Sequence, residues 1–223
     1  KKKCTFKTAA FAELITVENI SEKISSSELD HIFKGQLDTA GITTEDSSKK
    51  FKFIHLNGAH VPYIYDKEMN IINEWDGTYE QSTQATLFGA MDYVEQLRES
   101  GAYDNTTIIV MSDHGFNGSL AQSGDATWMR QCAMLLVKGR NEHHDTMQIS
   151  QAPISFEDLQ EAYVRLLDGQ QSDSVFDWKE GDVRERRFLR YSFLDDSHMQ
   201  EYMQTGYASD MDTMILTGRE FNR

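Results

Sequence analysis

A run of β-branched and apolar residues at positions 106–111 gives way at once to Ser112, Asp113, His114 and Gly115. Buried strands of parallel sheets have continuous apolar runs of this kind, whereas strands with one solvated face alternate apolar and polar residues. Residues 134–137 are a shorter run of the same type, and residues 51–57 are a further strand candidate. The pattern therefore predicts three strands in the central part of the chain.

Helical spacing of apolar residues occurs in three further places. The clearest covers residues 83–100, and Gly101 stands where a helix commonly ends. A second helix is predicted from a serine cap at Ser27 to Gly41. A third is predicted within 155–169, because residues Ser155 to Asp158 resemble a capping box.

The order strand, helix, strand is typical of a βαβ unit with a right-handed crossover. We therefore expect an α/β fold with a mainly parallel sheet flanked by helices, formed by residues 51–176. Residues 1–50 are read as a helix followed by a polar loop. Strand candidates at 187–193 and 213–216 predict a small antiparallel element within the accessory segment 177–223.

Composition narrows the classes of function. The 223 residues carry a formal net charge of −14, which argues against a nucleic-acid or anionic membrane partner. No apolar run approaches the roughly 20 residues that a transmembrane helix needs. Cys4 and Cys132 are too few for a disulfide framework. We expect a chain without a membrane segment that has room for one sizeable core.

Polar side chains follow two of the predicted strands. Asp113 and His114 follow the apolar run at 106–111, and His60 lies in the loop after the strand at 51–57. In open parallel sheets, ligands bind at the carboxyl ends of the strands, so these side chains are expected to face one crevice. Carboxylate oxygen and imidazole nitrogen are both ligands of first-row divalent metals. The sequence therefore predicts a metal site at Asp113 and His114.

Residues 55–63 and 103–115, with 134–139 and 152–159 following in the same order, resemble the sulfatase branch of the alkaline phosphatase superfamily. Membrane-anchored sulfatases, lipoteichoic acid synthases and phosphoethanolamine transferases are the most similar members. The resemblance covers about residues 51–169 and corresponds to the carboxy-terminal half of that family's catalytic domain.

The resemblance implies that Asp113 and His114 are paired metal ligands and that His60 contacts the transferred anionic group or the leaving group. It implies sulfate-ester hydrolysis, with transfer of phosphoglycerol or phosphoethanolamine groups as the alternative. It also implies an extracellular or cell-surface location. An Asp–His pair favours Mn²⁺ or Zn²⁺ over Ca²⁺, which remains an alternative, because Ca²⁺ prefers oxygen ligands alone.

The family's nucleophile and its first acidic metal ligand come from an early strand-to-helix turn. That turn has no counterpart in this sequence, and neither proline belongs to a sulfatase nucleophile motif. We therefore expect the chain to lack part of its active site, which a missing amino-terminal half of the same polypeptide would supply. As it stands, the chain is expected to be inactive towards sulfate- or phosphate-ester substrates.

A non-catalytic binding or interaction domain is the alternative of another class. The net charge and the missing nucleophile fit it. The adjacent His143 and His144 are expected in a solvated loop rather than in a metal site. The arginines between positions 184 and 190 are expected to pair with carboxylates, with anion recognition by one of them as the alternative.

Overall fold

The computed structural model describes residues 28–44, 50–116, 132–192 and 195–222. Within them the chain contains both α-helices and small β-sheets, as expected for a mixed α and β protein. It divides into two compact units, Lys1–Ser100 and Gly101–Arg223, each of which is described by itself. Cys4 and the predicted cap Ser27 lie outside the described residues.

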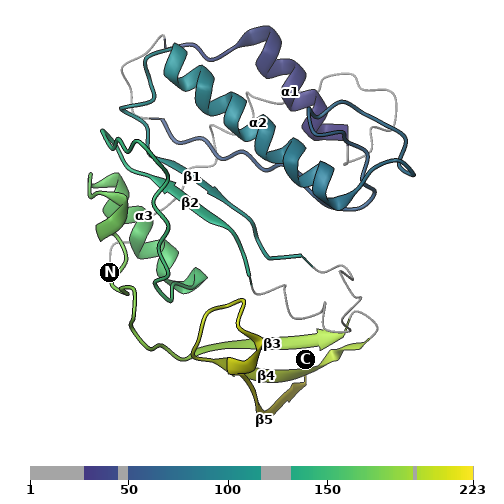
Figure 1. Cartoon of the computed structure of the whole chain (residues 1–223), viewed down its shortest axis with the longest axis vertical. Helices are drawn as coiled ribbons and strands as arrows, with labels where there is room; N and C mark the ends of the chain where they lie inside the picture. Colours follow the sequence, from purple (N-terminus) through teal and green to yellow (C-terminus); the bar gives the residue numbers. More distant parts are fainter. Residues whose placement is uncertain (1–27, 45–49, 117–131, 193–194, 223) are drawn as a thin grey trace. The chain divides into compact units, whose positions relative to one another are not determined.

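The first unit is built on two helices, α1 (Leu29–Ala40) and α2 (Tyr79–Glu99), which lie side by side (Figure 1). The Thr78 side chain accepts a hydrogen bond from the Gln81 amide at 3.1 Å, and the Gln81 side chain accepts one from the Thr78 amide at 3.0 Å. This capping box starts α2 four residues before the predicted position at 83. Gly41, with φ of 63°, ends α1 as predicted.

The core of the first unit lies where the loop before α2 covers that helix. Tyr65, Met69 and Ala85 are almost completely buried and pack together. Gly89 of α2 allows this approach, because a Cβ there would lie 2.8 Å from the Met69 Cε atom. Residues 51–57, predicted as a strand, form no strand; Phe51 and Phe53 of this segment are exposed. An extended segment becomes a stable strand only with a hydrogen-bonded neighbour.

The second unit contains a two-stranded sheet of β1 (Ile108–Met111) and β2 (Leu135–Lys138). The strands lie at the predicted positions but pair antiparallel, with Ile109 opposite Val137. No parallel pair of strands occurs among the described residues, so the expectation of a mainly parallel sheet is not met there. An apolar run predicts that a strand is buried, but it carries little information on the direction of its neighbour.

Helix α3 (Leu159–Leu167), preceded by the short 3₁₀ helix η4 (Phe156–Asp158), packs against β1 and β2 (Figure 1). Its buried Ala162 and Leu166 form a core with Val175, Ile109 and Val137. The predicted capping box is present, since the Asp158 carboxylate accepts a hydrogen bond from the Ser155 amide at 2.7 Å. A second short 3₁₀ helix, η5 (Ser172–Ser174), follows α3.

A three-stranded antiparallel sheet ends the chain: β3 (Arg186–Ser192), β4 (Asp195–Gln204) and β5 (Met214–Asn222), with the 3₁₀ helix η6 (Met211–Thr213) before β5. The predicted antiparallel element is therefore present, although β4 was not predicted.

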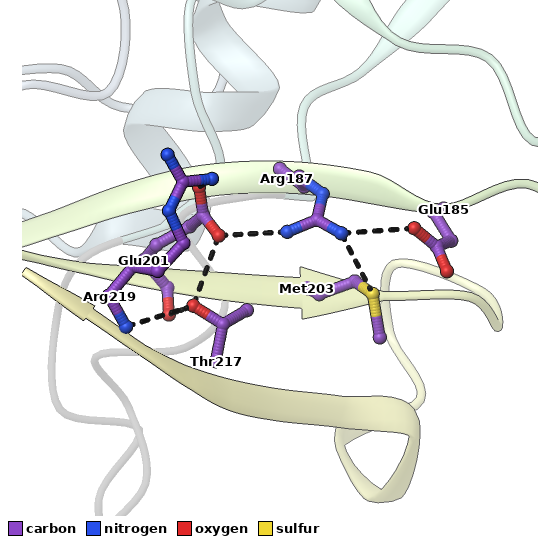
Figure 2. A network of polar contacts seen from close by, with 6 residues as sticks. All are labelled: Glu185, Arg187, Glu201, Met203, Thr217 and Arg219. Carbon is purple, nitrogen blue, oxygen red and sulfur yellow. Dashed lines mark hydrogen bonds and ion pairs between the residues drawn. The ribbon is translucent and has the colours of Figure 1, made fainter.

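One buried carboxylate links the three strands of this sheet (Figure 2). Glu201 of β4 accepts hydrogen bonds from Arg187 of β3 and Arg219 of β5, each at 2.9 Å, and from the Thr217 hydroxyl at 3.0 Å. The register of β4 and β5 shifts at this point, and Gly218 has a φ of 80°. Such a bulge lets both Thr217 and Arg219 reach one carboxylate.

Candidate functional site

The predicted metal ligands lie directly beyond the end of β1. Asp113 is almost fully exposed and His114 is partly exposed. The Asp113 Oδ2 and His114 Nε2 atoms are 3.7 Å apart, and the His114 amide donates to Asp113 Oδ1 at 2.9 Å. Both residues follow β1 closely. The residue between β1 and Asp113 is Ser112, whose amide donates a hydrogen bond to the carbonyl of Met134, the residue before β2, at 3.1 Å.

The His114 ring is oriented by its own backbone. Its Nδ1 atom lies 2.6 Å from the carbonyl oxygen of Gly115, an acceptor that requires Nδ1 to carry the proton. In the neutral ring the lone pair is then on Nε2, the atom nearest the Asp113 carboxylate. A backbone carbonyl bound to the other ring nitrogen is a common feature of histidines that ligate metals.

The distance between these two atoms suits a divalent transition metal. Metal–ligand bonds of about 2.1 Å place two tetrahedral ligands about 3.4 Å apart. The observed 3.7 Å needs only a small rotation of the exposed Asp113 carboxylate. The described residues contain no group of three or more His, Cys, Asp or Glu side chains able to hold a metal ion. Asp113 and His114 are therefore two candidate ligands without a third such side chain beside them in the described part of the chain.

His60 belongs to the first unit, in an irregular exposed segment followed by a cis peptide bond between Val61 and Pro62. Its Nδ1 atom lies 2.6 Å from the Val61 carbonyl oxygen. The ring is therefore held in the same tautomer as that of His114, with Nε2 able to accept or, once protonated, donate a proton. His60 and the Asp113–His114 pair lie in different units, so their convergence stays a prediction.

The turn before His60 is held by Asp30 of α1, which the sequence did not single out. The buried Asp30 carboxylate accepts hydrogen bonds from the amides of Asn57 and Gly58 at 2.7 and 2.8 Å. Burial raises the pKa of Asp30 above its ordinary value of 3.8, although both amide hydrogen bonds oppose the change. Asp30 is therefore a positioning residue for the segment that carries His60.

The start of α1 also contacts the loop that follows His60. The His31 Nδ1 atom lies 3.0 Å from the Met69 carbonyl oxygen, and the His31 amide donates to the Tyr65 hydroxyl at 3.3 Å. Burial raises the pKa of Tyr65 to about 12, so the hydroxyl remains protonated at neutral pH. Two adjacent residues of one helix thus fix the segments on both sides of His60.

His143, His144, Arg184 and Arg187 have structural partners. His144 contacts the buried Glu142 at 3.1 Å, and His143 contacts Asp104 at 3.5 Å; both histidines are exposed, as predicted. Arg184 pairs with Glu157 and Asp158, and Arg187 pairs with Glu185 and Glu201. These pairs confirm the predicted pairing with carboxylates for Arg184 and Arg187. Arg186 forms no hydrogen bond through Nε or Nη2 to the described residues.

Comparisons of the chain with models of protein families, with curated proteins and with solved structures find no match. Among the described residues, no helix is both long and apolar enough to cross a membrane.

Proposed function

We propose that this chain is part of a metal-dependent hydrolase of sulfate esters. Asp113 and His114 supply two ligands of a divalent cation, and His60 acts on the leaving group. The observation that carries the proposal is the Asp113–His114 pair at the end of β1, where Nδ1 of His114 is hydrogen-bonded to a carbonyl oxygen and Nε2 lies 3.7 Å from the Asp113 carboxylate. The resemblance to the sulfatase-like family, with its parallel sheet and extracellular setting, belongs to the same proposal.

Mn²⁺ or Zn²⁺ fits this pair better than Ca²⁺, because one of the two ligands is a nitrogen. When bound, such a cation neutralises the non-bridging oxygens of the ester and lowers the pKa of a hydroxyl nucleophile. Two ligands hold a cation weakly. The proposal therefore requires further ligands and a nucleophile from outside the described residues.

His60 is proposed as the general acid for the departing oxygen. Its Nδ1–H bond to the Val61 carbonyl fixes the ring, so Nε2 is the atom that delivers a proton when the ring is protonated. Asp30 supports this role by holding the Asn57–Gly58 turn two residues earlier.

Metal binding tests the first part of the proposal. The affinity for Mn²⁺ and Zn²⁺ is measured by calorimetry on the chain, and on the longer polypeptide if the coding sequence extends beyond it. We expect Asp113→Ala and His114→Ala to weaken binding by more than the roughly 10- to 100-fold that changes beside a ligand cause. The matched control is Asp104→Ala, an exposed acid of the same unit. Equal affinity in Asp113→Ala would contradict the proposal.

Turnover tests the second part. For the chain alone we expect no metal-dependent hydrolysis of aryl sulfates, because it lacks a nucleophile. In a polypeptide that supplies one, we expect hydrolysis that EDTA abolishes and that His60→Gln reduces by about 10²- to 10⁴-fold. Activity on phosphodiesters but not on sulfates would identify the phosphoryl transferase alternative. Metal binding without turnover of either ester would favour a non-catalytic binding domain.

A further inference from the structure

Arg186, the first residue of β3, has two buried donors without an acceptor among the described residues. Its Nε and Nη2 atoms have almost no solvent contact and form no hydrogen bond. These two nitrogens form one edge of the planar guanidinium group, the edge that binds carboxylate, sulfate or phosphate through two parallel hydrogen bonds. An uncompensated charge of this kind is costly to bury, so an anionic partner is strongly favoured.

The two described groups that interact electrostatically with Arg186 do not neutralise its charge. Arg184 lies near enough to repel it and is itself paired with Glu157 and Asp158. Cys132 also lies within electrostatic range, but burial raises the pKa of its thiol, which is therefore uncharged at neutral pH. Burial and the repulsion from Arg184 both lower the pKa of Arg186, which nevertheless remains charged because a guanidinium loses its proton only far above neutral pH.

Arg186 lies within electrostatic range of Cys132, which stands two residues before Met134. Ser112 and Met134 are joined by two hydrogen bonds, from the Ser112 amide to the Met134 carbonyl at 3.1 Å and from the Met134 amide to the Ser112 hydroxyl at 2.8 Å. His114 lies two residues after Ser112, and Cys132 lies two residues before Met134. Cys132, with Arg186 close to it, therefore belongs to the same end of the β1–β2 pair as Asp113 and His114.

We propose that Arg186 binds a tetrahedral oxyanion, sulfate or phosphate, through Nε and Nη2. This proposal deepens the proposed function and rests on it for the identification of the anion as the charged group of an ester substrate. Anion binding itself requires only Arg186, so it can be measured without metal and without turnover. Arg186 would then recognise the charge of the substrate at the end of the sheet that carries the metal ligands.

The experiment measures binding of inorganic sulfate and inorganic phosphate to the 223-residue chain by calorimetry, at constant ionic strength maintained with NaCl. The variants are Arg186→Met and Arg186→Lys, and Arg140→Met is the matched control, because Arg140 is an exposed arginine of the same unit. We expect Arg186→Met to raise the dissociation constant at least about tenfold. Arg186→Lys should raise the dissociation constant by an intermediate factor, since lysine keeps the positive charge but lacks the two parallel N–H donors of the guanidinium group. Arg140→Met should bind as the unchanged chain does.

Thermal unfolding without added anion separates recognition from a structural role. Arg186→Met removes an unpaired buried charge, so its midpoint is expected to equal or exceed that of the unchanged chain. A clearly lower midpoint would indicate that Arg186 stabilises the fold and would overturn the proposal. Equal anion binding by Arg186→Met, or no anion binding by the unchanged chain, would also overturn it.

The aryl sulfate 4-nitrophenyl sulfate, which the chain alone is not expected to hydrolyse, distinguishes an ester site from a site for the free anion. Competition with inorganic sulfate that disappears in Arg186→Met supports recognition of the ester. Binding of inorganic sulfate alone restricts the site to the free anion and overturns the substrate role. Failure of the proposed function would give a different result. Asp113→Ala would then bind the metal as tightly as the unchanged chain does, while the unchanged chain would still bind sulfate or phosphate through Arg186.

Discussion

The carboxylate of Asp30 lies 2.7 Å from the amide nitrogen of Asn57, 27 positions later in the chain. A second amide, that of Gly58, binds the other oxygen of the same carboxylate. One buried acid near the start of α1 therefore fixes the backbone that leads to His60. The arrangement satisfies two donors in a turn that has no partner strand among the described residues.

Replacing Asp30 by alanine leaves two amides without their acceptor. We expect a loss of about 1–3 kcal/mol in the free energy of unfolding. Asp38→Ala is the control on the same helix, because the half-exposed Asp38 makes an i,i+4 ion pair with Lys34 and should contribute less than about 1 kcal/mol. Urea unfolding followed by circular dichroism measures both. Equal losses of stability in the two variants would contradict the proposed role of Asp30 in holding the backbone at Asn57 and Gly58.

The raised pKa of Asp30 also predicts a dependence of stability on pH. Because its folded-state pKa lies above the ordinary 3.8, the folded state binds the proton more tightly than the unfolded state. This contribution to stability is fully present below pH 3.8 and is lost as the pH rises through the folded-state pKa. Asp30→Asn should remove that part of the pH dependence. Unfolding midpoints measured across this acidic range would show a flatter profile for the variant.

Glu142 is predicted to have the opposite dependence on pH. Burial disfavours its charge, but hydrogen bonds from the Ser172 hydroxyl, the Gly139 amide and His144 outweigh burial and lower its pKa below the ordinary 4.5. Its contribution is present above pH 4.5 and is lost as the pH falls through the folded-state pKa. At pH 7, Glu142→Gln should cost about 1–3 kcal/mol.

Glu161→Gln is the control for Glu142→Gln, since the Glu161 side chain is largely exposed. Chemical unfolding at pH 7 and again below pH 4 measures both. The difference between Glu142→Gln and the unchanged chain should shrink in acid, whereas an undiminished difference would rule out the charged form of Glu142 as the stabilising species.

Leu166 and its neighbour Leu167 offer a matched pair for testing the core against β1 and β2. Leu166 is 1% exposed, whereas Leu167 is 65% exposed. Leu166→Ala should cost about 2–5 kcal/mol through lost burial and the cavity that remains. Leu167→Ala should change the free energy of unfolding by less than about 0.5 kcal/mol. Comparable losses at both positions would mean that α3 does not pack as described.

The carboxyl-terminal sheet should depend on Glu201. Glu201→Ala removes the shared acceptor of Arg187, Arg219 and Thr217, so we expect a lower midpoint of thermal unfolding. Glu220→Ala, at an exposed position of β5, is the control and should leave the midpoint nearly unchanged. A larger effect of Glu220→Ala would contradict the network in Figure 2.

The sequence predicts local structure better than it predicts the pairing of distant segments. The sequence indicates α2 because its apolar spacing and Gly101 lie within one short segment, although the capping box at Thr78 was not recognised. β1 and β2 were found from their apolar runs, but their antiparallel pairing depends on contacts between residues about 30 positions apart. β4 was missed because acidic and polar residues interrupt its apolar pattern.

The same limit applies to the candidate site. Asp113, His114 and His60 were singled out because acids and histidines after apolar runs are a local signal. Asp30 was not singled out, because it lies in the first turn of a helix. Acids are common there and are usually exposed to solvent. Its role depends on Asn57 and Gly58, and nothing within the helix itself indicates that the carboxylate is buried.

The position of Glu201 in the central strand has a consequence for how the last three strands find one another. A slip of one residue between neighbouring strands moves every side chain to the opposite face. Such a slip would move the Glu201 carboxylate to the face opposite Arg187 and Arg219. The carboxylate and both guanidinium groups would then lose their ion pairs. Misaligned pairings are thereby penalised. The acid that interrupts the apolar pattern of β4 selects the one alignment in which its charge is neutralised from both neighbours.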